Sequence, residues 1–266
     1  MQYMGALIGD YCGSKYEWSN FRGTLDEGMD LLETGKFTDD SVLTVAIMDW
    51  LNNGGPEGEF GVGKYLREWA QKYPSAGYGG RFKGWVASEK DEPINSFGNG
   101  SAMRVSPCAY YANTLEECLE LAKVSAEVTH NHPEGVKGAQ AIAEAIYLAR
   151  SGAGKDGIKT TIENDFGYDL NKSIEEIGRR AHRFDATCQV TVPEAIIAFL
   201  NSRDFLDAIR IAIWIGGDSD TIAAIAGSIA EAYYGIPSFV EENMKEKLPN
   251  DFKEVIVKFN EKMLKR

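Results

Sequence analysis

The chain has 266 residues, and its 44% apolar and 11% aromatic content is ordinary for a folded globular protein rather than a disordered one. With 28 basic and 40 acidic residues it carries a formal charge of −12, which does not favour general binding to nucleic acid. The same negative field repels small phosphate esters unless bound cations reverse it locally.

The four cysteines have no CxxC spacing and no nearby set of histidines, so we expect neither a zinc site nor a disulfide framework at Cys12, Cys108, Cys118 and Cys188. The N-terminus lacks a basic segment followed by a long apolar core, and no apolar run approaches the ~20 residues that span a bilayer. We therefore expect a soluble, cytoplasmic protein with no membrane partner. The sequence does not determine the oligomeric state, for which we favour a monomer.

The first predicted helix lies within residues 1–14, where small residues permit close packing. Glu17 follows between two aromatic residues, and it is either a surface acid beside packed rings or a functional loop residue. The next predicted helix covers residues 39–53 and begins at Thr38-Asp39-Asp40-Ser41. Such a start is typical of helix N-caps, where Asp, Ser and Thr are preferred and acids are stabilised by the helix dipole.

A further helix is predicted at 60–72, followed by the loop Gly77-Tyr78-Gly79, whose backbone N–H groups are free to face an anion. A second Gly-rich loop carries Phe97-Gly98-Asn99-Gly100-Ser101 and, beyond it, Met103 and Arg104. Ser101 is a plausible helix cap, and the helix start there could face phosphate. Phe97 either stacks on a base or fills the core. Arg104 either grips a phosphate or, as we favour, pairs with an acid.

Thr114 is predicted to cap a helix over 115–127, and Pro133 suits the first turn of another that runs to about Arg150. Between them, His130 and His132 could be read as a metal pair, but no third nitrogen or sulfur ligand is evident. We therefore interpret His130 as a hydrogen-bonding or substrate-contacting residue and His132 as a helix-entry residue.

Helical patterns continue to the end of the chain, at 155–164, 171–181, 193–201, 204–214, 221–234 and 250–264. Val190-Thr191-Val192 could form a short strand, but nothing elsewhere offers it a partner. No internal repeat or linker divides the sequence, so we predict one all-α domain over residues 1–266, a compact orthogonal helical bundle.

The stretch Gly217-Asp218-Ser219-Asp220-Thr221 is the second predicted helix start that carries two acids and a threonine. Such a start offers only oxygen ligands, which suit a hard cation such as Mg²⁺ or Mn²⁺. Taken with residues 38–40, the two starts supply enough oxygen atoms for a site that binds two metal ions.

Four ordered blocks of the sequence resemble the ADP-ribosylglycohydrolase family, which includes the J1 crystallins. The blocks are Gly9-Asp10-Tyr11-Cys12-Gly13 leading to Glu17, Thr38-Asp39-Asp40-Ser41, Gly98-Asn99-Gly100-Ser101-Ala102-Met103-Arg104, and Gly217-Asp218-Ser219-Asp220-Thr221. Tyr11 and Cys12 stand where many members have small residues, and Ser41 replaces the commoner threonine. These departures remove no metal ligand, although changes at 11 and 12 could reshape the pocket.

The resemblance implies an all-helical fold with two Mg²⁺ or Mn²⁺ ions at its centre. It implies that the ions are held by the residues matching the family's ligands, Thr38, Asp39, Asp40, Asp218, Asp220 and Thr221. It further implies substrate contacts from residues 77–79 and 98–104, and a position near the substrate for His130.

The implied reaction is hydrolysis of the C1″ glycosidic bond between ADP-ribose and an acceptor on a protein or small molecule. Glu17 is the preferred acid/base residue, with Asp39, Asp40 and Asp218 as further catalytic carboxylates. Two other interpretations stay open: a non-catalytic ADP-ribose-binding or crystallin-like protein, and a metal-dependent hydrolase that cuts the pyrophosphate instead.

Overall fold

The structure is a computed structural model that describes residues 2–19, 21, 23–25, 29, 31–88, 90–178 and 184–266. Within these residues the chain forms helices and no strand, apart from one isolated antiparallel bridge between Gly98 and Thr187. The helices are α1 (Gly5–Gly13), α2 (Asp39–Asn52), η1 (Gly55–Glu57), α3 (Val62–Lys72), α4 (Gly80–Ser88), α5 (Gly100–Met103), α6 (Ser106–Tyr111), α7 (Leu115–Glu127), α8 (Pro133–Arg150), α9 (Lys155–Phe166), α10 (Ile174–Gly178), α11 (Cys188–Asn201), α12 (Phe205–Ile215), α13 (Ser219–Tyr234), α14 (Ser238–Lys247) and α15 (Asn250–Met263). The all-α prediction is confirmed.

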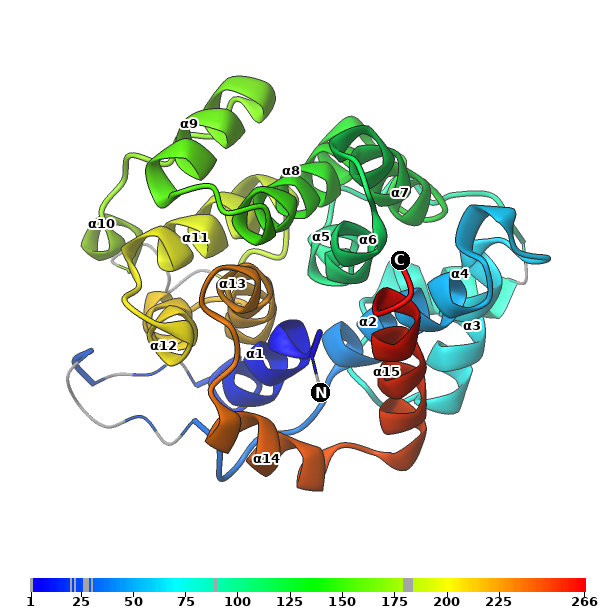
Figure 1. Ribbon diagram of the computed structural model, residues 1–266, viewed down its shortest axis with the longest axis horizontal. Coiled ribbons are helices and arrows are strands. Elements are labelled where there is room, and N and C mark those ends of the chain that lie inside the picture. Colours follow the sequence, from blue (N-terminus) through cyan, green and yellow to red (C-terminus); the bar gives the residue numbers. More distant parts are fainter. Residues whose placement is uncertain are drawn as a thin grey trace.

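Helix α13 lies at the centre of the bundle and packs against α1, α8, α11 and α12 (Figure 1). Its contact with α1 is at backbone distance, because glycines recur every four residues on the facing side of α1. A Cβ atom at Gly9 would lie 2.0 Å from the carbonyl oxygen of Ala223, and one at Gly13 would lie 2.5 Å from that of Ser219. Only glycine allows this approach, and it brings the C-terminal half of α1 beside the first turn of α13.

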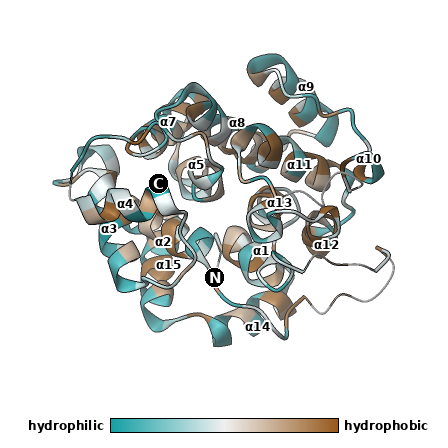
Figure 2. Ribbon diagram, turned by 180° about the vertical axis from the view of Figure 1, so that it is seen from behind, coloured by the Kyte–Doolittle hydropathy of each residue, from teal (hydrophilic) through white to brown (hydrophobic). Residues whose placement is uncertain are grey.

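Helix α2 forms a second centre, packed against α1, α3, α6 and α15. Nearly all of its residues are buried, so it is apolar around most of its circumference, as a helix inside a core must be. Figure 2 shows apolar residues concentrated on inner helices such as α2 and α12, while α3 and α9 present hydrophilic residues at the periphery. The starts of α2 and α13 are therefore both held within the core.

The short strand considered at Val190–Val192, for which no partner was evident in the sequence, does not form, because these residues lie in α11. Their β-branched side chains favour a strand locally, but Thr191 and Val192 are fully buried on a helix that packs against α8, α12 and α13. Pro193 lies inside this helix, where a missing N–H is normally costly. Tertiary packing has overridden the local preference.

Two helices, α4 and α14, were not predicted from the sequence. Each buries only two side chains, Phe82 and Trp85 in α4 and Val240 and Met244 in α14, which is too few for a clear helical period. The helix predicted at 171–181 is represented by α10, and residues 179–181 lie outside the described part of the chain.

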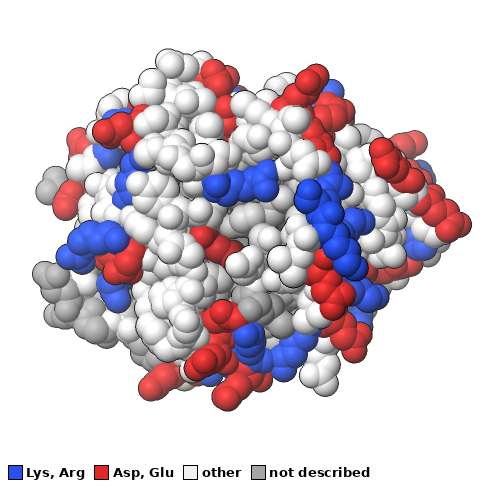
Figure 3. Space-filling model, viewed as in Figure 1, with Lys and Arg blue, Asp and Glu red and all other residues white. Residues whose placement is uncertain are grey.

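The surface is rich in acidic side chains, in keeping with the net charge of −12. On the face drawn in Figure 3 these acids are interspersed with Lys and Arg. Among the described residues, no helix is both long enough and apolar enough to cross a membrane.

Candidate active site

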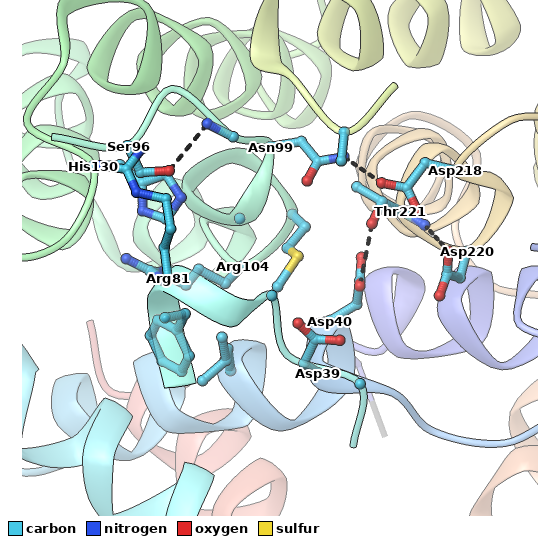
Figure 4. Close-up of a pocket in the computed structure, with 18 of the residues that line it drawn as sticks. Asp39, Asp40, Arg81, Ser96, Asn99, Arg104, His130, Asp218, Asp220 and Thr221 are labelled. Carbon is cyan, nitrogen blue, oxygen red and sulfur yellow. Dashed lines mark hydrogen bonds between the residues drawn. The ribbon is translucent and has the colours of Figure 1, made fainter. Parts of the chain in front are cut away.

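The two acid-rich helix starts meet inside the molecule. Asp39 and Asp40 form the first turn of α2, and Asp218, Asp220 and Thr221 lie at the start of α13. The Thr221 hydroxyl donates to Oδ2 of Asp40 at 3.2 Å, which joins the two helices directly (Figure 4). The predicted convergence of these segments, far apart in the sequence, is confirmed.

Asp10 of α1 holds the start of α2 in place, a role that the sequence analysis did not assign. Its fully buried carboxylate accepts from the Thr38 backbone N–H at 2.8 Å, the Thr38 hydroxyl at 2.7 Å and the Ser41 backbone N–H at 3.1 Å. The Ser41 hydroxyl donates to the same carboxylate. Asp10 therefore satisfies N–H groups that a helix start leaves free, and Thr38 caps α2 by accepting from the Asp40 N–H at 3.3 Å.

Burial, and then the crowding of carboxylates, raises the pKa values of the acids in this cluster. Burial, and then the nearby Asp220 carboxylate, raise the pKa of Asp10 and of Asp39 to about 7. The same two causes raise the pKa of Asp40 and Asp218 well above the ordinary value. Like charges this close disfavour simultaneous ionisation, so the cluster is a site that a cation would stabilise.

The residues present fit a divalent cation. Carboxylate oxygens of Asp10, Asp40 and Asp220 lie within 4.8 Å of one another, and so do those of Glu17, Asp218 and Asp220. Oδ1 of Asp40 is buried and has no hydrogen-bond partner among the described residues. An orphaned buried carboxylate oxygen is costly, and a hard cation that prefers oxygen ligands would satisfy it.

Glu17 lies in the loop after α1 and reaches the same cluster. Its pKa is raised to about 7, first by burial and then by the Asp220 carboxylate, while Lys36 acts in the opposite direction. A carboxyl group that titrates near neutral pH can both take and return a proton. Glu17 is thus placed beside the acids, with the proton affinity that acid/base chemistry needs.

A cavity of about 460 Å³ opens beside the acids, within the size range of small-molecule sites. The predicted site residues that line it are Glu17, Asp39, Asp40, Gly77, Gly79, Gly98, Asn99, Gly100, Met103, Arg104, His130, Asp218, Asp220 and Thr221. The structure thus brings most of the predicted set to one space. Asn99 ties the second Gly-rich loop to the acids, since its Nδ2 donates to Oδ2 of Asp218 at 2.7 Å.

The other end of the cavity is basic. Arg81 of α4, Arg104 and His130 lie there, across the cavity from the acids (Figure 4). Burial, followed by Arg104 and Arg81, lowers the pKa of His130 well below its ordinary value, so the ring is neutral at pH 7. The Thr129 hydroxyl lies 2.7 Å from Nδ1 of His130, which orients the ring.

Arg104 has no acidic partner among the described residues, so the favoured ion pair is not found. Its fully buried guanidinium donates at 2.9 Å to the Ser125 carbonyl and at 2.9 Å to the Thr129 hydroxyl. Burial lowers its pKa to about 10, which leaves it protonated at pH 7. Its Nε and Nη1 atoms are buried and have no hydrogen-bond partner in the described part of the chain, and this leaves donors over for an anion or a sugar oxygen.

Glycines shape the wall between the two ends. A Cβ atom at Gly100 would lie 3.1 Å from Nε2 of His130, so a side chain there would press on the ring and displace it by a few tenths of an ångström. Gly77 has φ +117°, a conformation that L side chains rarely adopt, and a Cβ there would lie 3.0 Å from Oδ1 of Asp39.

Four predicted site residues do not line the cavity. Thr38 lies behind the acids, bonded to Asp10. Tyr78 lines a separate, smaller pocket, and its ring stacks on Phe82 with centroids 5.4 Å apart. Phe97 packs against His132 at 5.3 Å. Ser101 is not a cap, because its buried hydroxyl donates to the Gly135 carbonyl at 2.7 Å.

His132 does what was expected of it, since it caps α8 by accepting from the Glu134 N–H at 3.1 Å. Several lining residues were missed altogether, among them Trp18, Arg81, Ile94, Ser96 and Phe184. Trp18 directly follows Glu17 and Arg81 lies two residues after Gly79, whereas Phe184 gives no local signal in the sequence.

The fold and the site together define a class of all-helical proteins in which two buried helix starts bring a cluster of oxygen ligands beside a cavity with a basic far end. The chain belongs to the ADP-ribosylglycohydrolase family, whose model matches residues 3–266.

Curated relatives and a solved structure agree with this membership. The chain is 26% identical to "ADP-ribosylarginine hydrolase Tri1" of Pseudomonas putida, covering 90% of this chain and 72% of that protein. It is 26% identical to human "ADP-ribosylhydrolase ARH3", covering 89% of this chain and 85% of that protein. A solved "ADP-ribosylglycohydrolase-related protein complex" shares the fold, with TM-score 0.71, 23% identity, and coverage of 96% of this chain and 94% of that chain.

Proposed function

We propose that this chain, as one catalytic domain, hydrolyses the C1″ bond between ADP-ribose and an acceptor, and so reverses ADP-ribosylation. The observation that carries the proposal is the polarity of the cavity, with Asp39, Asp40, Asp218 and Asp220 at one end and Arg81, Arg104 and His130 at the other. The basic end suits the pyrophosphate and adenosine, and the acidic end suits the ribose that is to be cut.

We propose that two Mg²⁺ or Mn²⁺ ions are held by Thr38, Asp39, Asp40, Asp218, Asp220 and Thr221. Bound there, such ions supply Lewis acidity and lower the pKa of water. They also offset the negative field that would repel a diphosphate. Asp10 fixes the geometry of this site from behind, through its bonds to Thr38 and Ser41.

Glu17 is the proposed acid/base residue. Its carboxylate lies within 4.8 Å of ligand oxygens of Asp218 and Asp220, and its pKa is near 7. Cleavage of a glycosidic bond passes through an oxocarbenium-like transition state and needs a proton moved between water and the leaving group. Glu17 stands where it can take the proton from the attacking water and return it to the departing acceptor.

The test is product analysis with mono-ADP-ribosylated peptides, in Mg²⁺ or Mn²⁺ buffer and after exhaustive chelation. We expect free ADP-ribose, loss of activity on chelation, and recovery when either ion is added back. Release of AMP would identify a pyrophosphohydrolase. Binding of ADP-ribose without release from any peptide would identify a non-catalytic binding protein, and turnover that survives chelation would remove the metal from the mechanism.

A further inference from the structure

Two exposed aromatic rings stand at the mouth of the cavity. Trp18 is 76% exposed and Phe184 is 48% exposed, and both line the cavity. Their rings stack with centroids 5.1 Å apart and planes at 13°. At this spacing nothing fits between them, so the face available to a ligand is the outer face of the pair. Exposed rings of this size on a cavity rim are typical of binding surfaces.

The pair belongs to the acidic end of the cavity. Trp18 directly follows Glu17. Phe184 lies in a loop that is hydrogen-bonded toward the acidic end through Ala186, two residues after it. The Ala186 carbonyl accepts from the Asn99 backbone N–H at 2.8 Å. The Asn99 side chain in turn donates to Asp218 at 2.7 Å. When the ADP group of the substrate extends toward Arg81 and His130, the acceptor group lies at the opposite, acidic end of the cavity, beside these two rings.

We propose that Trp18 and Phe184 form the acceptor subsite, and that the acceptor they fit is the guanidinium of ADP-ribosylated arginine. This proposal rests on the proposed function. A guanidinium is planar and cationic, so it stacks on aromatic faces. It also suits a site flanked by the Glu17 carboxylate on a chain of net charge −12. A serine oxygen would use neither the aromatic face nor the negative field, and a nucleic acid would be repelled by that field.

The experiment compares release of ADP-ribose from three substrates: a peptide modified on arginine, the same peptide modified on serine, and an oligonucleotide modified on a base. The proteins are wild type, Trp18→Ala, Phe184→Ala, Trp18→Phe and the control Phe239→Ala. Phe239 is an exposed aromatic, 59% accessible, that lies on α14 and does not line the cavity.

We expect wild type to prefer the arginine substrate by at least about tenfold in kcat/KM, an advantage that one cation–π contact can supply. Trp18→Ala and Phe184→Ala should each lower the arginine-to-serine ratio by roughly five- to tenfold. Trp18→Phe should keep most of the ratio, and Phe239→Ala all of it. The affinity for free ADP-ribose, measured by calorimetry, should change less than the ratio.

A wild-type preference for serine or for the base, or an equal loss on all three substrates, overturns the acceptor subsite and leaves the hydrolase standing. Failure to release ADP-ribose from any substrate overturns the hydrolase, and the acceptor subsite with it. Circular dichroism of each variant establishes that an altered ratio comes from a folded protein.

Discussion

The two ends of the cavity are built in opposite ways. At the acidic end the side chains are linked to one another, since Asp10 holds Thr38, Thr221 holds Asp40, and Asn99 holds Asp218. At the basic end, two buried nitrogens of Arg104 have no partner within the residues that the structure describes, and Arg81 is exposed. The acidic end is therefore preorganised by the protein itself, as chemistry requires, whereas the basic end leaves donors free for a ligand.

The comparison predicts that damage at the acidic end removes turnover more than binding. Asp218→Ala deletes a proposed metal ligand, and the loss of about 4 kcal/mol of transition-state stabilisation corresponds to roughly a thousandfold in kcat. The fold should persist, because the substitution also removes a carboxylate that Asp220 repels. Single-turnover kinetics and circular dichroism measure the two effects. A rate close to wild type in Mg²⁺ buffer would contradict the assignment.

Substitutions at the basic end should weaken substrate binding more than they lower turnover. Arg81 lines the cavity, and in the structure its guanidinium donates to the Ile94 carbonyl. A charge-assisted bond from it to phosphate is worth about 1.5 kcal/mol, so Arg81→Ala should weaken ADP-ribose binding roughly tenfold. The expected signature is a raised KM with kcat nearly unchanged, against the control Arg266→Ala at the far C-terminus. A fall in kcat with KM unchanged would contradict the assignment of substrate binding to the basic end and of turnover to the acidic end.

The sequence was informative about the acidic end and much less so about the basic end. Helix starts with two acids and a threonine are local patterns, so Asp39, Asp40, Asp218 and Asp220 could be found without a structure. Asp10 could not be assigned, because its role depends on how α1 packs beside α2. The same applies to the basic end, where Arg81 enters through α4, a helix with too few buried residues to be recognised.

The orientation of the aromatic rings also could not be predicted from the sequence. Tyr78 and Phe97 belong to the two Gly-rich loops that were identified, yet neither lines the cavity, while Trp18 and Phe184 do. Backbone position could be anticipated from the loop pattern, but which side of a loop a side chain occupies is decided by its neighbours in the core. For the same reason the β-branched run at 190–192, considered as a short strand, is part of helix α11.

A raised carboxyl pKa is not by itself evidence that a residue belongs to the candidate active site. Glu144 offers a test, because it has a raised pKa but lies away from the cavity. Glu144 lies on α8, is 1% exposed, and lines neither end of the cavity. Burial, and then Asp165, raise its pKa to about 7, the same value as Glu17. The folded state therefore holds its proton more tightly than the unfolded chain, whose pKa is near 4.5. The stabilisation is complete below pH 4.5 and is lost as pH rises through 7.

The substitution Glu144→Gln keeps the shape of the side chain and removes its ionisable carboxyl group. Between pH 5 and 8 the free energy of unfolding of wild type, relative to this variant, should fall by about 2 to 3 kcal/mol, measured by urea denaturation in Mg²⁺ buffer. Asp165→Asn should reduce that fall without abolishing it, because burial is the larger cause. Activity of Glu144→Gln at pH 7 should stay near that of wild type. If turnover of Glu144→Gln instead falls by as much as is predicted for Asp218→Ala, proximity to the cavity does not separate the proposed catalytic carboxylates from the structural ones.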